Sequence, residues 1–168
     1  MATLQKIVPC LWFDTQAEEA AKFYVGVFEK GSRIVQVTRY GKAGQDVHGR
    51  AEGSVMTVVF ELEGQPLTAL NGGPHFKFNE AVSLQVMCDS QAEIDRFWEK
   101  LGAGGDPKAQ QCGWLKDKFG LSWQIVPRMM DDMWSEGVSE KTERAMEAML
   151  KMKKLDIAEL EKAYNGTT

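Results

Sequence analysis

The chain has 168 residues, of which 43% are hydrophobic and 26% charged, as expected for a globular domain with a short extension. Its formal net charge of −4 provides no basic surface for nucleic acid, and no apolar run approaches the roughly 20 residues that cross a bilayer. The three cysteines are widely spaced and form no CxxC pair, so we expect reduced thiols and a cytoplasmic protein without nucleic-acid or membrane partners.

The first half of the chain predicts one strand, one helix and three further strands. Residues 7–13 are apolar and rich in strand formers, which predicts the first strand. Alanines and aromatic residues at helical spacing predict a helix over 17–28, with Asp14 or Thr15 accepting hydrogen bonds from its first free amides. Three strands are predicted to follow, at residues 32–40, 55–62 and 65–70.

The second half repeats this order. Residues 14–18 and 89–93 carry nearly the same five residues, Asp-Thr/Ser-Gln-Ala-Glu, each between an apolar run and a helical pattern. Such a repeat predicts two copies of one module. The elements expected in the second copy are a strand, a helix and two strands, at 81–88, 92–101, 111–116 and 121–126. The strand that would complete this copy has only a weak signal, within 107–111.

Beyond residue 128 the sequence becomes rich in methionine and helical in its spacing. We therefore expect paired modules over residues 1–128, divided into about 5–72 and 80–128. A helical extension over 129–168 is predicted to pack on this domain or on a dimer partner.

Three segments resemble the PhnB-like branch of the vicinal oxygen chelate superfamily, which is often labelled demethylubiquinone 3-methyltransferase-like. They are PCLWFDTQAEEAAKFYVGVF, VMTVVFELEGQPLTALNGGPHFKFNEAVS and CGWLKDKFGLSWQIVP. The resemblance covers about residues 5 to 128. It implies an α+β fold of two βαβββ modules, as in glyoxalase and bleomycin-resistance proteins, whose cupped mixed sheets surround a cleft. It also implies a homodimer, and the C-terminal helical tail would follow the modules.

The resemblance further implies a place for a metal. In active enzymes of the superfamily four inward positions, two per module, hold a divalent ion through His, Glu or Gln, and the ion acts as a Lewis acid. The matching positions in this chain are Pro9, Thr68, Ser83 and Gln124. Because these are poor ligands, we expect no cofactor and no tight metal site. A divalent metal would require a shifted register that recruits Cys10 and Gln85.

A ligand site is expected where the two modules meet. His75 is the one candidate for acid–base catalysis, with a loop-anchoring hydrogen bond as the alternative. Tryptophans on strands can line a concave site for a planar or apolar ligand, or can pack in the core. The candidate lining residues are Trp12, Asn71, His75, Trp114, Trp123 and Gln124.

These observations favour a protein that binds a small organic molecule as a sequestering or resistance-type binder, and they leave open whether it is an enzyme. The first alternative is a metal-dependent lyase, isomerase or dioxygenase with a non-standard ligand set. The second is a dimeric structural or regulatory module. Methyltransferase activity is not expected, because neither glycine cluster follows a strand and opens a helix. The sequence names neither the ligand nor the pathway.

Overall fold

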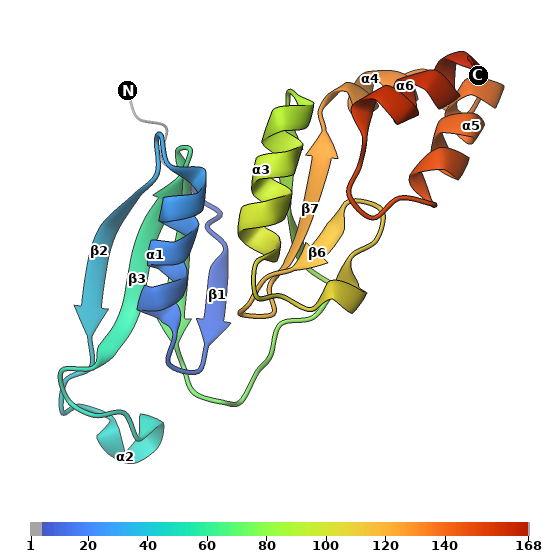
Figure 1. Ribbon diagram of the computed structural model, residues 1–168. Helices are drawn as coiled ribbons and strands as arrows, with labels where there is room; N and C mark the ends of the chain where they lie inside the picture. The colour runs from blue at the N-terminus through green and yellow to red at the C-terminus, as the bar shows by residue number, and fades with distance from the viewer. Residues whose placement is uncertain (1–4, 168) are drawn as a thin grey trace. The chain divides into compact units, whose positions relative to one another are not determined.

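The computed structural model describes residues 5–167, which form two compact units. The first unit ends at Lys77 and the second begins at Phe78. Each unit contains one mixed β-sheet with a helix packed on it, as Figure 1 shows, so the predicted α+β class with two related modules is confirmed. Within residues 5–167, none of the helices has the length and apolar character needed to cross a bilayer.

The first unit is a four-stranded sheet covered by one long helix (Figure 1). Its elements are β1 (Cys10–Phe13), α1 (Ala17–Phe28), β2 (Arg33–Arg39), α2 (Gln45–His48), β3 (Val55–Leu62) and β4 (Gln65–Asn71). The strand order is β1-β4-β3-β2, with β1 parallel to β4 and the other neighbours antiparallel. Small residues of α1 lie buried, and the ring of Tyr24 stacks on that of Phe60 at 6.2 Å.

Two details of the first unit differ from the prediction. Strand β1 begins at Cys10 and not at Ile7, because Pro9 has no amide hydrogen to add to the ladder. The Pro9 carbonyl still accepts from the amide of Thr68 at 3.0 Å. The loop predicted over 41–53 contains the short helix α2.

The second unit repeats the pattern with a three-stranded sheet. Its elements before the tail are β5 (Ser83–Cys88), α3 (Gln91–Gly102), the 3₁₀ helix η1 (Pro107–Ala109), β6 (Trp114–Lys116) and β7 (Ser122–Pro127). The strand order is β5-β7-β6, with β5 parallel to β7 and β6 antiparallel to it. Helix α3 buries Ile94, Phe97 and Leu101, while Trp98, the fourth residue of the apolar stripe that the sequence predicts, is half-buried.

The second module is one strand short in the part of the chain that the structure describes. The weak strand signal at 107–111 becomes the turn η1, because Asp106 accepts a hydrogen bond from the amide of Lys108 and Pro107 fits the first helical position. Strand β6 starts only at Trp114, since Cys112 has a φ of 50° that an extended strand excludes.

Three helices form the C-terminal tail. They are α4 (Met129–Trp134), α5 (Glu140–Met149) and α6 (Ile157–Asn165). The tail is attached to the second unit by its main chain: the amide of Cys112 donates to the carbonyl of Met152 at 2.9 Å. The amide of Gly113 donates to the carbonyl of Lys153 at 2.8 Å. Helices α5 and α6 pack on each other, and Leu155 between them is buried. A contact of the tail with a dimer partner stays a prediction.

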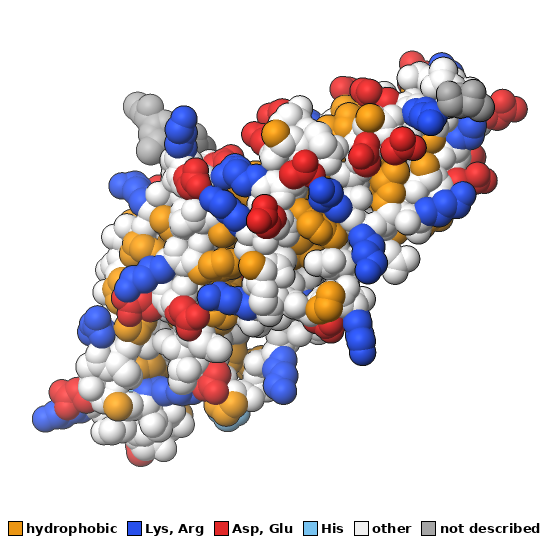
Figure 2. Space-filling model, in the orientation of Figure 1, with side chains coloured by type: hydrophobic (Ala, Val, Ile, Leu, Met, Phe, Trp, Pro, Cys, Tyr) orange, Lys and Arg blue, Asp and Glu red, His pale blue; other side chains and the backbone are white. Residues whose placement is uncertain are grey.

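Charged side chains of both signs are intermixed on one face of the molecule. On the face that Figure 2 shows, lysine and arginine lie beside aspartate and glutamate on both units and on the tail. This mixture agrees with the formal net charge of −4. The face therefore gives no further reason to expect nucleic acid as a partner.

Candidate functional site

The open face of the second sheet carries the candidate site. Side chains alternate between the two faces of a strand, and α3 covers the face that holds Val86, Leu115 and Ile125. The opposite face carries rows of paired residues across the strands. They are Ser83, Ser122 and Lys116 in the first row, Gln85, Gln124 and Trp114 in the second, and Met87 with Val126 in the third. The register therefore places a polar, partly aromatic surface on this side of the sheet.

A cavity of about 430 Å³ lies between this face and the tail. The second row supplies Trp114 and both glutamines, and the tail supplies side chains from α4, α5 and the segment before α6. Its full lining is Gln85, Cys112, Trp114, Gln124, Val126, Met130, Asp131, Trp134, Met149 and Leu155. Two indoles and two methionines surround two amides and the Asp131 carboxylate, so the pocket combines aromatic and apolar walls with several polar groups.

The amides of this cavity are held by one another. Gln124 donates through Nε2 to Oγ of Ser83 at 2.8 Å. Gln85 donates through Nε2 to Oε1 of Gln124 at 3.3 Å. The Gln85 side chain is exposed, so its carbonyl oxygen faces the solvent side of the network. This chain of bonds fixes the Gln124 amide and leaves it one further N–H and one further lone pair of its carbonyl oxygen.

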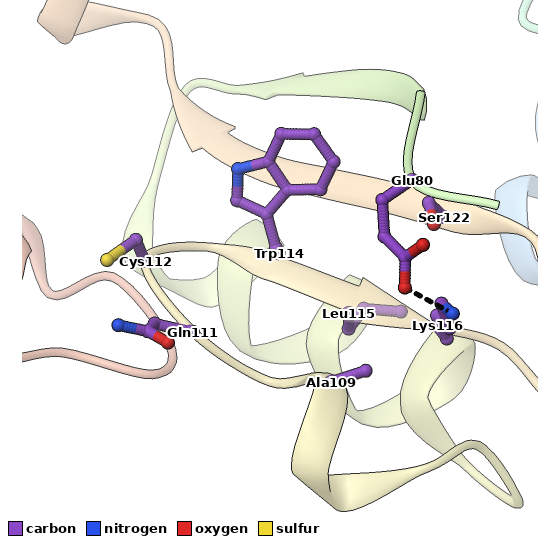
Figure 3. Close-up of a pocket in the computed structure, with 8 residues that line it drawn as sticks. All are labelled: Glu80, Ala109, Gln111, Cys112, Trp114, Leu115, Lys116 and Ser122. Carbon is purple, nitrogen blue, oxygen red and sulfur yellow. Dashed lines mark ion pairs between the residues drawn. The ribbon is translucent and has the colours of Figure 1, made fainter. Parts of the chain in front are cut away.

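A second hollow of about 420 Å³ adjoins the first, and Trp114 and Cys112 line both. Figure 3 shows Glu80 entering it beside Trp114, with its carboxylate directed at the ammonium group of Lys116. This hydrogen bond, with the charge of Lys116, holds the pKa of the Glu80 carboxyl below its ordinary value of 4.5. The Glu80 side chain is 64% exposed and that of Lys116 only 26%, so the carboxylate closes the hollow from outside.

Ser122 is the one buried side chain among residues 5–167 whose polar atom has no hydrogen-bond partner. The residue is 1% exposed and lines the second hollow next to Lys116, its cross-strand neighbour. Leaving a buried hydroxyl unsatisfied costs about 1–3 kcal/mol, and native proteins contain few such groups. The hydroxyl therefore marks a position where a partner is expected.

The structure brings together only some of the predicted residues of the second unit. Trp114 and Gln124 are direct cross-strand neighbours and share the 430 Å³ cavity. Trp123 lies on the opposite face, 2% exposed, and donates through Nε1 to Oδ2 of Asp117 at 2.8 Å. The buried Asp117 carboxylate also accepts the amides of Phe119 and Leu121. Trp123 thus has a core environment in which its N–H is satisfied.

The predicted residues of the first unit lie near the end of β4. Trp12 donates through Nε1 to the carbonyl of Gly73 at 2.8 Å, and its ring meets Phe76 edge-on at 4.9 Å. Phe76 is 65% exposed and His75 is exposed beside it. The Asn71 side chain is buried and occupied at both ends by main-chain groups of its own unit. Trp12 and Phe76 thus form a second aromatic surface, which belongs to the first unit.

The positions that match the superfamily's metal ligands lie in pairs, one pair in each unit. Pro9 is hydrogen-bonded to Thr68 through the main chain, and Ser83 to Gln124 through side chains. The pairing supports the register of the match. Pro9 has no side-chain atom that can coordinate a metal, Thr68 and Ser83 carry hydroxyls, and the Gln124 amide is already hydrogen-bonded to the Ser83 hydroxyl. This set does not fit a divalent transition metal. Within residues 5–167 no group of three or more His, Cys, Asp or Glu side chains is gathered for one.

Both glycine clusters have conformational or packing reasons. A side chain at Gly72 would overlap the ring of Trp12, and Gly73 has a φ of 104°. A side chain at Gly105 would overlap the carbonyl of Lys116, and Gly104 has a φ of 76°. The glycines therefore serve close approach and turns in this structure.

Sequence reasoning did not select the residues that the tail contributes to the site. Met130, Trp134 and Met149 line the first cavity, whereas the methionine-rich face of the tail was expected mainly to pack, with ligand binding as the less favoured alternative. Lys116 and Ser122 line the second hollow. One signal was available: along β7 every second residue from Ser122 on lies on the face that α3 does not cover.

The fold is that of the vicinal oxygen chelate superfamily. A Mesorhizobium loti structure of the fosfomycin resistance protein FosX is similar with a TM-score of 0.52, at 15% identity over 79% of this chain and 99% of that one. A Pseudomonas aeruginosa protein is similar with a TM-score of 0.57, at 21% identity over 74% of this chain and 98% of the other. At these identities the likeness shows the fold alone.

The chain belongs to the family described as 3-demethylubiquinone-9 3-methyltransferase, whose sequence model matches residues 5–126. The PhnB protein from Bacillus cereus, a solved structure described by the same name, is 36% identical. That similarity covers 73% of this chain and 99% of the Bacillus chain, with a TM-score of 0.61. The comparison with curated proteins gives no significant match. The tail lies almost wholly outside the family match.

Proposed function

We propose that this protein binds a small organic molecule on the open face of its second sheet, beneath the helical tail. The observation that carries the proposal is the 430 Å³ cavity in which Trp114 and Gln124 of the sheet meet Trp134 of the tail. This volume lies within the range of small-molecule sites, and such sites combine apolar walls with a few polar groups.

The lining favours a flat, largely apolar ligand with at least one hydrogen-bonding group. Trp114 and Trp134 offer aromatic surface, and Met130 and Met149 adapt their shape to what they contact. The amide of Gln124 offers a donor and an acceptor to the ligand. The role that fits these features is that of a sequestering or resistance-type binder in the cytoplasm, acting as a homodimer.

The proposal includes no tight catalytic metal. Its support is the donor chemistry of Pro9, Thr68, Ser83 and Gln124, which supplies neither imidazole, thiolate nor carboxylate. Elemental analysis of untagged protein, before and after dialysis against a chelator, tests it. We expect metal far below one equivalent and an unchanged melting temperature. Near-stoichiometric Mn, Fe, Co, Ni or Zn would contradict the proposal and favour a metal-dependent lyase, isomerase or dioxygenase.

Methyl transfer does not form part of the proposal, despite the family description. Neither glycine cluster links a strand to a helix as a cofactor-binding turn would: Gly104 and Gly105 follow α3, and Gly72 leaves room for the ring of Trp12.

The binding proposal is tested by screening planar aromatic compounds and mapping each hit by NMR. We expect hits to shift the indole N–H signals of Trp114 and Trp134, assigned from Trp→Phe variants. Trp114→Leu and Gln124→Leu should each weaken binding about 10-fold or more. Gln65→Ala, an exposed amide in the first unit, should leave it unchanged. Hits that bind both Leu variants with wild-type affinity would contradict this site.

A further inference from the structure

We propose that the second hollow, the one of about 420 Å³ that Trp114 shares with the cavity beneath the tail, is a carboxylate subsite. It is formed by Lys116 and Ser122 and closed by Glu80. The inference rests on the proposed function, because it assigns a chemical class to the same ligand: a planar organic acid. Its flat body would lie against Trp114 and its carboxylate would reach Lys116 and Ser122.

The first observation is the unmet hydroxyl of Ser122. Its Oγ is buried, lacks a hydrogen-bond partner among residues 5–167, and belongs to the lining of the hollow. Ser122 and Lys116 are direct cross-strand neighbours, so their side chains leave the same face of the sheet about 5 Å apart at Cβ. A hydroxyl and an ammonium group so placed offer two donors to the two oxygens of one carboxylate.

The second observation is that the hollow already holds a carboxylate. Glu80 extends into it and pairs with Lys116 (Figure 3), but Ser122 remains without a partner. Glu80 comes from the segment just before β5 and is largely exposed, and an exposed ion pair of this kind is weak. A ligand carboxylate can therefore replace Glu80 at Lys116 and gain the Ser122 hydroxyl as an additional donor.

The third observation fixes the shape of the ligand. Trp114 lines both cavities, so one indole borders the space beneath the tail and the Lys116 hollow. A molecule in contact with the Trp114 ring can reach both spaces. One ammonium group provides a single positive charge, which matches a carboxylate better than a doubly charged phosphate ester.

The experiment compares acids with their neutral amides on the full chain. Benzoate, naphthalene-2-carboxylate and indole-3-acetate are titrated by calorimetry beside the three matching carboxamides. We expect the best acid to bind at least 10-fold more tightly than its amide. Lys116→Met should remove this preference, and Ser122→Ala should weaken the acid about 5- to 10-fold with no effect on the amide. Glu80→Gln should tighten the acid about 3- to 10-fold, because it removes the competing carboxylate.

Lys151→Met is the matched control, since it removes one exposed positive charge from the tail. Wild-type affinity of this control for the acids is expected. Amides that bind as tightly as acids, with Lys116→Met behaving as wild type, would overturn the carboxylate subsite and leave the binding function standing. If neither acids nor amides bind below about 1 mM while a neutral screening hit shifts Trp114, the subsite alone is likewise overturned. If nothing shifts Trp114, both proposals fail.

Discussion

The two units start their main helices from nearly the same five residues, yet each helix is capped in a different way. In the first unit the cap comes from β4, the strand next to β1 in the sheet but far from α1 in the sequence. The amide of Ala17, the first residue of α1, donates to Oδ1 of Asn71 at 2.8 Å, and the side chain of Gln16 makes no capping bond. Asp14 or Thr15 was expected to accept from the first free amides of α1, but the amide of Ala17 donates to Asn71.

In the second unit the same stretch caps its own helix. Ser90 accepts from the amide of Glu93 at 3.3 Å, and the Glu93 carboxylate accepts from the amide of Asp89 at 2.7 Å. Gln91, the counterpart of Gln16, is then free to hold the tail. It donates through Nε2 to the carbonyl of Leu155 and accepts through Oε1 from the amide of Ile157.

The residue that decides between the two arrangements lies outside the repeat. In β4, Asn71 pairs with Phe13, and in β7 the equivalent residue, Pro127, pairs with Cys88. Asparagine has a side-chain acceptor for a helix amide, whereas proline has none. A nearly identical local sequence thus has a remote cap where the last strand supplies an acceptor and a local cap where it does not. In the second unit Gln91 is then available to attach the helical tail.

The largest expected effect comes from removing the remote cap. Asn71→Ala leaves the amide of Ala17 and the carbonyl of Val55 without partners inside the unit, which should lower the free energy of unfolding by about 2–4 kcal/mol. Chemical denaturation measures the loss, and hydrogen exchange assigns it to α1 and β4. Gln65→Ala, at the exposed start of β4, should stay within about 0.5 kcal/mol of wild type. Equal effects of both changes would refute the remote cap.

Weakening the attachment of the helical tail should have the next largest effect. Gln91→Ala removes two hydrogen bonds to the tail, so the amides of α6 should exchange about 5- to 30-fold faster, while those of α3 stay protected. The same substitution at the matched position, Gln16→Ala, should leave the exchange of both units unchanged. Unaltered exchange in α6 after Gln91→Ala would mean that other contacts hold the tail.

The local cap should cost less to remove than the remote one. Ser90→Ala is expected to lower the free energy of unfolding by about 1 kcal/mol, because water can reach the freed amide of Glu93. Thr15→Ala, its counterpart in the first unit, should change stability by less than about 0.5 kcal/mol. Denaturation curves for both variants decide this point, and a larger loss for Thr15→Ala would reverse the comparison.

The smallest effect concerns acid. Hydrogen bonds from Lys154 and then Gln91 hold the pKa of Asp95 below its ordinary value of 3.8. A carboxyl with a depressed folded pKa adds stability that is present above its unfolded pKa and lost as pH falls through the folded value. The protection factors of the tail amides should therefore fall below about pH 4. Asp95→Asn should remove that part of the pH dependence, and an identical profile for both proteins would exclude this contact.

Hydrophobic spacing was sufficient to predict most of the helices and strands. It was not sufficient to predict which residues of neighbouring strands and helices lie side by side. Strand β3 has the bounds that alternation and its flanking turns predict, because a half-buried strand repeats every two residues. The role of Asn71 depends on a helix amide 54 residues earlier, which no local pattern contains. The tail's attachment was also beyond prediction, since it uses main-chain groups at Cys112 and Gly113.

The candidate site shows the same limit. Trp114 and Gln124 were chosen for their chemistry, and the β6–β7 register places them side by side. Trp123 and Gln124 are consecutive in one strand, so alternation alone excludes that both line the same face. Lys116 and Ser122 look ordinary in the sequence, and they become candidate ligand contacts only because they line the same hollow.

The main-chain attachment of the tail has a consequence for how the sequence of the tail can change. The bonds from the amides of Cys112 and Gly113 do not depend on which side chains residues 152 and 153 carry. Mutations can therefore accumulate in the tail, and reshape the walls that Met130, Trp134 and Met149 provide, without detaching it. The same sheet can in this way carry different covers, each selecting a different molecule.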